Sequence, residues 1–358
     1  MSTISTPGST SKPWPSEHLE AVPHCPVCGS ASGRTLWHED MTDRVFRIAP
    51  GVWSLYRCND CGSGWLDPRP DAASLPDAYS GYFTHDAIRQ RVIVRRTDYA
   101  RRWLHDVLNG YMNHRYGTRH ENALAYGRWL AWLAPPLRAA ADATCRHLPP
   151  VPKGGGRLLD VGCGNGAFLR LAQGMGWTVA GVDFDPDAAR QARAAGFEVT
   201  VGGVESLSEV DCYDVITISH VIEHVPDPCA SLRAMWRLLK PNGTLWLETP
   251  SLRSLGHRMY GSDWRGLEPP RHLVLFDGPS LQSALRNSGF LDISQHWNAL
   301  VSFEVLRSSA AIRRGGDALA TGASIRRLPL ELLMEGIEML IPAHREFLTF
   351  TARKPATT

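Results

Sequence analysis

The chain has 358 residues, of which 43% are hydrophobic and 21% are charged. This length allows two or more packed units with a sizeable core. Lys and Arg together number 38, against 36 for Asp and Glu, so the charge balance provides no general attraction to nucleic acid or to a membrane. No apolar run approaches the roughly 18 residues that a membrane-spanning helix needs. These features argue against a membrane partner.

Residues 1–17 are rich in Ser, Thr, Pro and Gly and contain no apolar segment. We expect them to form a disordered tail and not a signal peptide, which favours a cytoplasmic protein. Of the eight cysteines, four form two Cys-x-x-Cys pairs near the N-terminus and four are scattered. This distribution does not suggest disulfides. Cys163 is interpreted as a packing residue, because the sequence places no base beside it.

The two Cys-x-x-Cys-Gly segments predict a zinc-binding ribbon over residues 18–75. Each segment places two thiolates on one tight turn, and together they supply four ligands, Cys25, Cys28, Cys58 and Cys61. Four cysteines leave no open coordination position, so the zinc is expected to be structural. Residues 37–48 and 52–56 are expected to form the hairpin strands between the pairs. Basic residues in this region are few and interleaved with acids, which favours a scaffold role over nucleic-acid binding.

Residues 76–150 are expected to form a helical linker or substrate-cap segment. A proline-rich linker over 68–76 leads to an aromatic cluster at 79–85, which we interpret as docking on the core in preference to lining a pocket. Apolar residues recur at helical spacing over 103–112, and a second helix is expected from about Asn122 to Arg138, ended or kinked by Pro135-Pro136. The basic flank of the first helix is interpreted as a solvated face in preference to a substrate site; it consists of Arg89, Arg91, Arg95, Arg96, Arg101 and Arg102.

Strands and helices alternate after the Pro- and Gly-rich boundary at 149–156. We expect helices at 166–174, 186–194, 228–239 and 279–287, and seven strands at 157–161, 177–182, 197–201, 213–218, 243–248, 291–297 and 346–353. This alternation predicts an α/β, doubly wound, mostly parallel sheet in a domain of residues 151–358. The ligand crevice of such a sheet lies at the carboxyl ends of its strands.

The stretch from Leu158 to Gly166, LLDVGCGNG, reads as a buried strand that enters a glycine turn and then a helix. The glycines let the backbone approach a ligand closely. Asp160 would repel a pyrophosphate, but it suits a ligand that carries an amine and a sulfonium. Asp183 closes the next strand about twenty residues later, where a carboxylate can accept both ribose hydroxyls. Phe184 can then lie against an adenine.

With the segments GVDFDP, YDVITISHVIEHVPDP and LLKPNGTLWLETP, the region from about 155 to 358 resembles the class I S-adenosylmethionine-dependent methyltransferases. The cysteine pairs further resemble a branch with an N-terminal zinc module, found beside enzymes of sugar and natural-product biosynthesis. The resemblance implies a seven-stranded Rossmann-like sheet. The cofactor-binding residues that it implies are Asp160, Gly162, Gly164, Asp183, Phe184, Val204, Ser219 and His220. The family's usual acid after the third strand is replaced by Gly203 or displaced to Glu205.

The run His220-Val221-Ile222-Glu223-His224 resembles a segment of ubiquinone-pathway O-methyltransferases that can hold a divalent cation. A cation at His220, Glu223 and His224 is one interpretation, and imidazoles that pack against the cofactor are the favoured one. Methyl transfer to a hydroxyl or amine also needs a base. His224 and His272 are the candidates, and His272 belongs to a proline-stiffened loop, 264–273, expected to cover the crevice. Arg271 of that loop is expected to be able to pair with an acidic acceptor.

These features together predict an S-adenosylmethionine-dependent methyltransferase that acts on an O, N or C atom of a small natural-product or sugar-like acceptor. One alternative is a methyltransferase of RNA or protein that docks through the ribbon and the basic helix. The other is a cofactor-binding protein without methylation activity, or an enzyme of another alkyl-transfer type. Residues 301–341, apolar at intervals, are expected to form either a lid or the surface of a homodimer.

Overall fold

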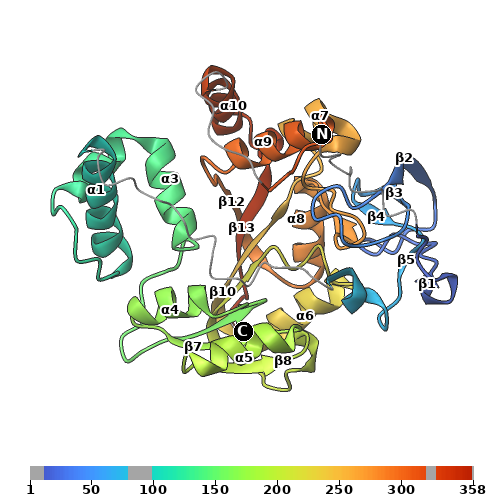
Figure 1. The fold of residues 1–358 in the computed structure, drawn as a ribbon. Helices are drawn as coiled ribbons and strands as arrows, with labels where there is room; N and C mark the ends of the chain where they lie inside the picture. Colours follow the sequence, from blue (N-terminus) through green and yellow to red (C-terminus); the bar gives the residue numbers. More distant parts are fainter. Residues whose placement is uncertain (1–11, 80–98, 320–327, 357–358) are drawn as a thin grey trace.

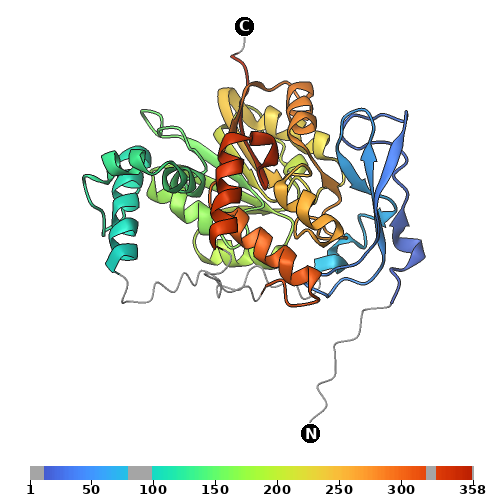
Figure 2. The same cartoon turned by 90° about the horizontal axis from the view of Figure 1, so that it is seen from above.

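The computed structural model describes residues 12–79, 99–319 and 328–356. Figures 1 and 2 show three parts in a row: a helical unit on one side, a central sheet, and a small sheet on the other side. The N-terminal residues form the small sheet, and the chain then crosses to the helical unit before it builds the central sheet.

The central sheet has seven strands in the order β12-β13-β10-β9-β6-β7-β8. Neighbouring strands from β10 to β8 are parallel, whereas β13 is antiparallel to both β10 and β12. The strand bounds are β6 Arg157–Val161, β7 Thr178–Asp183, β8 Glu198–Val201, β9 Tyr213–Ser219, β10 Leu239–Pro250, β12 Leu291–His296 and β13 Phe347–Arg353. The predicted doubly wound α/β sheet is therefore confirmed, and β10 alone is clearly longer than expected.

The sequence explains why these elements form where they do. Strands β6 and β9 are almost continuously buried, as expected for parallel strands covered on both faces. Three of the connecting helices begin at an aspartate that caps the first backbone N–H groups, followed by a proline in the first turn: Asp185, Asp227 and Asp277. The four predicted helices of this region are α4 Ala167–Gly174, α5 Pro186–Ala194, α6 Pro228–Leu238 and α8 Gly278–Asn287.

The small sheet, which we call the ribbon sheet, takes three strands from the N-terminal region and one short strand from the region after residue 270. Its order is β11-β4-β3-β2, with β2 Arg34–Met41, β3 Trp53–Cys58, β4 Gly64–Leu66 and β11 Val274–Leu275. Val274 pairs with Trp65 in an antiparallel ladder. The ribbon sheet is thus completed by a strand that directly follows the loop of His272.

The region expected to be a linker, 68–76, is partly structured. Strand β5 Arg69–Pro70 pairs with β1 Leu19–Glu20, and the 3-10 helix η2 Leu75–Tyr79 follows. Arg69 is buried and donates to the carboxylate of Glu20 at 2.7 Å. The prolines therefore lie in an ordered segment and not in a free linker.

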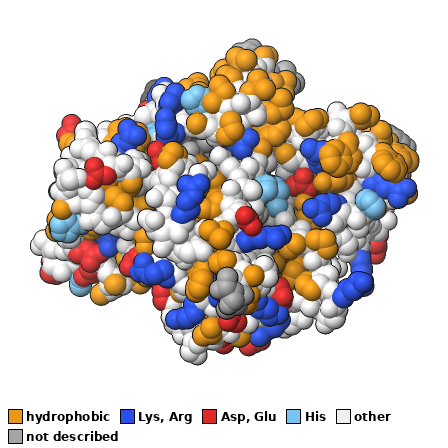
Figure 3. All heavy atoms as spheres, turned by 180° about the vertical axis from the view of Figure 1, so that it is seen from behind, with side chains coloured by type: hydrophobic (Ala, Val, Ile, Leu, Met, Phe, Trp, Pro, Cys, Tyr) orange, Lys and Arg blue, Asp and Glu red, His pale blue; other side chains and the backbone are white. Residues whose placement is uncertain are grey.

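The helical unit consists of α1 Tyr99–Tyr116, α2 Gly127–Leu130, the 3-10 helix η3 Ala131–Leu133 and α3 Pro135–Thr144. The predicted helix from Asn122 to Arg138 is wrong, because Pro135-Pro136 begins α3. Proline lacks a backbone N–H, and the first helical turn does not require one. Of the basic flank, Arg89, Arg91, Arg95 and Arg96 lie outside the described residues. Figure 3 shows hydrophobic side chains gathered over this unit, where Trp129 is 66% exposed and Leu133 is 80% exposed.

The region from 301 to 341 contains α9 Ser302–Arg313 and α10 Leu328–Leu340, which lie against each other. Helix α7 Leu255–Tyr260 also packs against α9. Several apolar side chains of α10 are exposed, among them Leu333 and Leu340. Across the described ranges, no helix combines the length and apolar character that crossing a bilayer requires.

Candidate functional site

A cavity of about 1110 Å³ opens at the carboxyl ends of β6, β7, β9 and β10. This is the edge at which a doubly wound sheet binds its ligand. One wall consists of the glycine loop and the strand ends, and the opposite wall consists of His224, the loop 264–273 and helix α9. Residues that line it include Tyr79, Gly162, Gly164, Asp183, Phe184, Ser219, His220, His224, Trp264, Arg265, Glu268, His272, Glu304, Val305, Ser308 and Phe347.

The glycine wall is held by Asp183. One carboxylate oxygen accepts the backbone N–H of Gly164 at 2.7 Å, and the other accepts that of Asp185 at 2.9 Å. Gly162 has a φ of 72°, and a Cβ there would lie 2.1 Å from Cγ2 of Val221. The turn therefore requires glycine both for its backbone conformation and for its space.

Six of the eight predicted cofactor residues line the cavity, and two do not. Val204 is buried in the core. Asp160 lies behind the loop, where it forms an ion pair with Arg146 and accepts a hydrogen bond from Thr217 at 2.8 Å. Burial raises the pKa of Asp160, although the charge of Arg146 opposes this shift. Asp160 thus supports the glycine loop from the side away from the cavity. Its direct contact with a ligand stays a prediction.

His224 and His272 lie together on the opposite wall, with ring centroids 4.7 Å apart. Nδ1 of His272 is 2.7 Å from the carbonyl oxygen of Gly266, and Nδ1 of His224 is 3.0 Å from that of Arg271. If each Nδ1 carries a proton, it donates a hydrogen bond to the carbonyl oxygen, and Nε2 is then the basic nitrogen of the ring. Burial lowers the pKa of His272 to about 4, which keeps its ring neutral near pH 7.

Glu223 is the third member of this cluster. Candidate ligand atoms of Glu223, His224 and His272 all lie within 4.8 Å of one another. Glu223 is fully buried; one of its oxygens accepts from Thr249 at 2.9 Å, and the other lies 3.4 Å from Nδ1 of His220. Two imidazoles and a carboxylate are ligand types that suit a divalent cation.

His220 has a different role from the one considered above. Its ring lies between two carboxylates, 3.4 Å from Glu223 and 3.5 Å from Glu248. Burial alone would lower its pKa, but the hydrogen bonds and charges of these two groups raise it to about 10. A protonated imidazole has no lone pair for a metal. The cluster that could hold a cation therefore contains His272 in place of His220.

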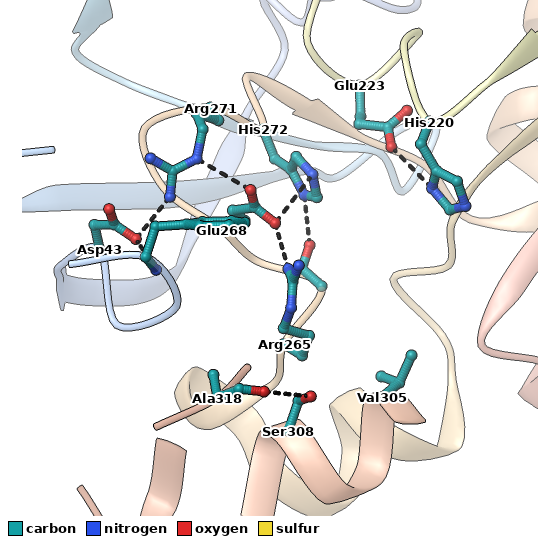
Figure 4. Close-up of polar contacts among 12 residues, drawn as sticks. Asp43, His220, Glu223, Arg265, Glu268, Arg271, His272, Val305, Ser308 and Ala318 are labelled. Carbon is teal, nitrogen blue, oxygen red and sulfur yellow. Dashed lines mark hydrogen bonds and ion pairs between the residues drawn. The ribbon is translucent and has the colours of Figure 1, made fainter. Parts of the chain in front are cut away.

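Arg271 does not face the cavity, so the expected pairing with an acidic acceptor is wrong. Its side chain is fully buried, with Asp43 at 2.6 Å and Glu268 at 3.0 Å (Figure 4). Arg265, which does line the cavity, forms an ion pair with Glu268. Two arginines therefore share one buried carboxylate, and their charges lower the pKa of Glu268 although burial opposes the shift.

Several cavity residues were missed from the sequence. Tyr79 was expected to dock on the core, but it lines the cavity, and its hydroxyl lies 3.0 Å from Nδ1 of His224. Residues 80–85 of the same aromatic cluster lie outside the described residues. Glu304, Val305 and Ser308 reach the cavity from α9. Ser308 follows Val305 by three residues and Glu304 by four, a little under and a little over one helical turn, so the three share a face, but no motif shows where that face points.

The four cysteines of the ribbon converge as predicted. The Sγ atoms of Cys25 and Cys61 are 3.6 Å apart, and those of Cys28 and Cys58 are 3.7 Å apart. Sulfurs bound to one tetrahedral zinc at about 2.3 Å lie about 3.8 Å from each other. A disulfide needs about 2.05 Å. The cluster is therefore compatible with a zinc site and not with disulfides.

Residues 129–295 match the model of a protein family described as methyltransferase domain. The chain contains a methyltransferase domain. This match agrees with the predicted methyltransferase family, and the seven-stranded, mostly parallel sheet confirms the predicted α/β fold.

Curated relatives match about a quarter of the chain. A protein named ubiquinone biosynthesis O-methyltransferase from Xanthomonas oryzae pv. oryzae is 40% identical over 103 residues, which cover 26% of this chain and 43% of that protein. The protein of the same name from Xanthomonas campestris pv. campestris is 39% identical over 103 residues, with the same coverage of both chains. The chain thus aligns with less than half the length of these relatives.

Solved structures are similar to a larger share of the chain. An S-adenosylmethionine-dependent methyltransferase from Mesorhizobium loti has a TM-score of 0.41 at 21% identity and covers 60% of this chain and 97% of its own. A second from Archaeoglobus fulgidus has a TM-score of 0.42 at 23% identity and covers 61% and 93%.

Proposed function

We propose that this protein is an S-adenosylmethionine-dependent methyltransferase that acts on an O, N or C atom of a small natural-product or sugar-like molecule. The observation that carries this proposal is a single cavity with the glycine loop and Asp183 on one wall and His224 and His272 on the other. The curated relatives are named for ubiquinone biosynthesis, which favours a small-molecule acceptor.

The residues of the glycine wall fit the cofactor. A carboxylate can accept about four hydrogen bonds, so the two backbone donors do not exhaust the capacity of Asp183 to accept from ribose hydroxyls. Phe184 is 49% exposed at the cavity and offers a ring face to the adenine. When bound, S-adenosylmethionine supplies an electrophilic methyl group. The chain's own contribution is to hold the acceptor in line with that group and to remove a proton.

His272 is the proposed base, with His224 beside it as the alternative. The Nδ1–H of His272 is anchored on the Gly266 carbonyl, and this fixes the ring with Nε2 as its basic nitrogen. Because burial keeps the ring neutral, Nε2 can accept a proton from a hydroxyl or amine. Glu223 lies within reach of both rings and can stabilise an imidazolium once it forms.

A catalytic cation held by Glu223, His224 and His272 would make a different use of the same side chains. In that case His272 could not also serve as the base, because the cation would occupy its Nε2. Turnover after exhaustive chelation, with and without added Mg²⁺, Mn²⁺ or Zn²⁺, separates the two arrangements. Chelator-resistant turnover supports the base, provided that metal analysis shows the ribbon still loaded.

For the ribbon we propose a structural zinc on Cys25, Cys28, Cys58 and Cys61, with no catalytic role. Thiolate ligands of this kind persist in a reducing compartment, and we keep the cytoplasm as the proposed location. A homodimer formed through the exposed apolar side chains of α10 also stays a prediction, and sedimentation equilibrium would test it.

The test begins with calorimetric titration of the intact protein with S-adenosylmethionine. It continues with transfer of a labelled methyl group to a panel of small phenols, hydroxy acids, amines and sugar derivatives. His272→Gln is expected to lower turnover about 100-fold or more and to leave cofactor affinity nearly unchanged. His296→Gln is a matched control, because its ring hydrogen-bonds to Thr351 outside the cavity. Absence of cofactor binding would overturn the proposal, and full turnover by His272→Gln would overturn the base assignment.

A further inference from the structure

Asp43 belongs to the loop between β2 and β3 of the ribbon sheet, yet it reaches the methyltransferase domain. Its side chain is fully buried and lies 2.6 Å from the guanidinium of Arg271. It also accepts the backbone N–H groups of Phe46, Ile48 and Ala49 at 3.0–3.1 Å. The loop is thus folded around this one carboxylate, which presents a fixed negative charge to Arg271.

Arg271 connects Asp43 to the cavity wall through Glu268. Its guanidinium donates to Asp43, to Glu268 and to the carbonyl oxygen of Ala78. The second oxygen of Glu268 bonds to Arg265 and lies 3.9 Å from Nε2 of His272. Figure 4 shows this chain of side chains running from Asp43 through Arg271 and Glu268 to the ring of His272.

We propose that Asp43 of the ribbon is a positioning residue for His272, acting through Arg271 and Glu268. The part played by His272 in turnover rests on the proposed function, whereas the coupling of Asp43 to the ring does not. The ribbon thereby contributes to the cavity of the methyltransferase domain, in addition to any role as a scaffold.

The charge arrangement explains why Asp43 matters to a ring that it does not touch. Glu268 lies between two guanidinium groups, those of Arg265 and Arg271. Asp43 neutralises Arg271 from the far side, so Glu268 is not drawn fully toward Arg271 and stays beside His272. Without the charge of Asp43, the buried guanidinium loses one of the two carboxylates that it contacts among the described residues, which is a costly change. We expect Glu268 to move toward Arg271 and away from Nε2 of His272.

A purely structural role for the Asp43–Arg271 pair is the alternative. The strand pairing of β4 with β11 already joins the ribbon to the loop of His272. A second ion pair, between Arg44 and Asp263, also links the same ribbon loop to the methyltransferase domain. Arg44 is the chain neighbour of Asp43, and its ion pair is with Asp263. Arg44→Gln therefore removes a second, more exposed link from the same loop and leaves the contacts from Asp43 to His272 in place.

The test compares Asp43→Asn with Arg44→Gln by ¹⁵N NMR of the histidine rings at neutral pH. The full-length, metal-loaded protein is used. Among the 14 histidines, the resonances absent from His272→Gln identify that ring. The ¹⁵N chemical shift of Nε2 of His272 is expected to differ from its wild-type value by more in Asp43→Asn than in Arg44→Gln. Equal or no movement in a folded, zinc-loaded Asp43→Asn overturns it.

Turnover provides a second measurement once an acceptor is found. Asp43→Asn is expected to lower kcat about tenfold to 100-fold with little change in cofactor affinity, and Arg44→Gln to keep wild-type turnover. Should Asp43→Asn fail to fold, Asp43→Leu combined with Arg271→Leu replaces the buried pair by apolar side chains, a change that folded proteins often tolerate. A His272 resonance unchanged in that double variant overturns the coupling. Because the NMR measurement needs neither cofactor nor acceptor, failure of the methyltransferase proposal would leave its result interpretable.

Discussion

The replacement of Asp183 by Asn tests the glycine wall of the cavity most directly. Asp183 accepts one backbone N–H on each oxygen, and the proposed ribose hydroxyls bind to the same carboxylate. Asn has one accepting oxygen, so its NH₂ group must face one of the two backbone donors. One amide of this buried site then loses its acceptor, which costs about 1–3 kcal/mol of folding free energy.

The same substitution weakens cofactor binding. A hydrogen bond to a charged acceptor contributes about 1.5–3 kcal/mol, and the loss of one such bond raises Kd roughly 10- to 150-fold. Calorimetric titration with S-adenosylmethionine and with its demethylated product measures this change. Thermal unfolding of the ligand-free protein measures the loss of stability separately.

Asp214→Asn is the matched control for Asp183→Asn. Asp214 also accepts a backbone N–H, from Arg157 at 2.8 Å, and it binds the ammonium group of Lys240 at 2.8 Å. It lies at the amino end of β9, away from the cavity, so its replacement is expected to lower stability without changing Kd. If Asp183→Asn binds the cofactor within about twofold of the wild-type affinity, the assignment of Asp183 to the ribose is refuted.

Three further changes probe other parts of the molecule. The pKa of His220 is raised to about 10, so its contribution to the free energy of unfolding is fully present below its unfolded-state pKa of about 6.5 and is lost as pH rises through 10. Denaturant unfolding from pH 6 to 10 should therefore show a decline in stability that is smaller in His220→Gln. Parallel stability curves for the wild type and the variant would count against the ion pairs. Cys58→Ser should lower bound zinc from about one equivalent per chain to a small fraction and destabilise the ribbon by several kcal/mol, measured by metal analysis and thermal unfolding. Gly162→Ala should unfold at lower temperature and bind cofactor at least about tenfold more weakly, because its Cβ would clash with Val221 in a left-handed turn. Normal cofactor affinity would mean that the loop is not part of the cofactor-binding site.

Local patterns explain which parts of the molecule could be predicted from the sequence. The strands, the helices between them and the glycine loop depend on residues close together in the chain, and their positions in the structure agree with expectation to within a few residues for most elements. The convergence of the four cysteines could also be predicted, because metal-ligand chemistry demands it. Pro135-Pro136 misled the helix prediction because the same residues can end one helix or begin the next.

The second wall of the cavity could not be predicted, since it is assembled by contacts between distant segments. Tyr79 reaches His224 from the segment that follows the ribbon, and Ser308 reaches the cavity from α9. Arg271 was expected to be able to pair with an acidic acceptor because its loop, 264–273, was expected to cover the crevice. Only the tertiary structure shows that Asp43 meets it across 228 positions of sequence.

The strand pairing between β4 and β11 has a consequence for how the protein is made. Trp65 leaves the ribosome more than 200 residues before its partner Val274. At about 5–20 residues per second, the edge of β4 stays unpaired for at least ten seconds or so of synthesis. An open strand edge that carries a tryptophan and a leucine is a site for association with other nascent chains. A chaperone that covers this edge would therefore protect the newly made chain until residues 274–275 arrive.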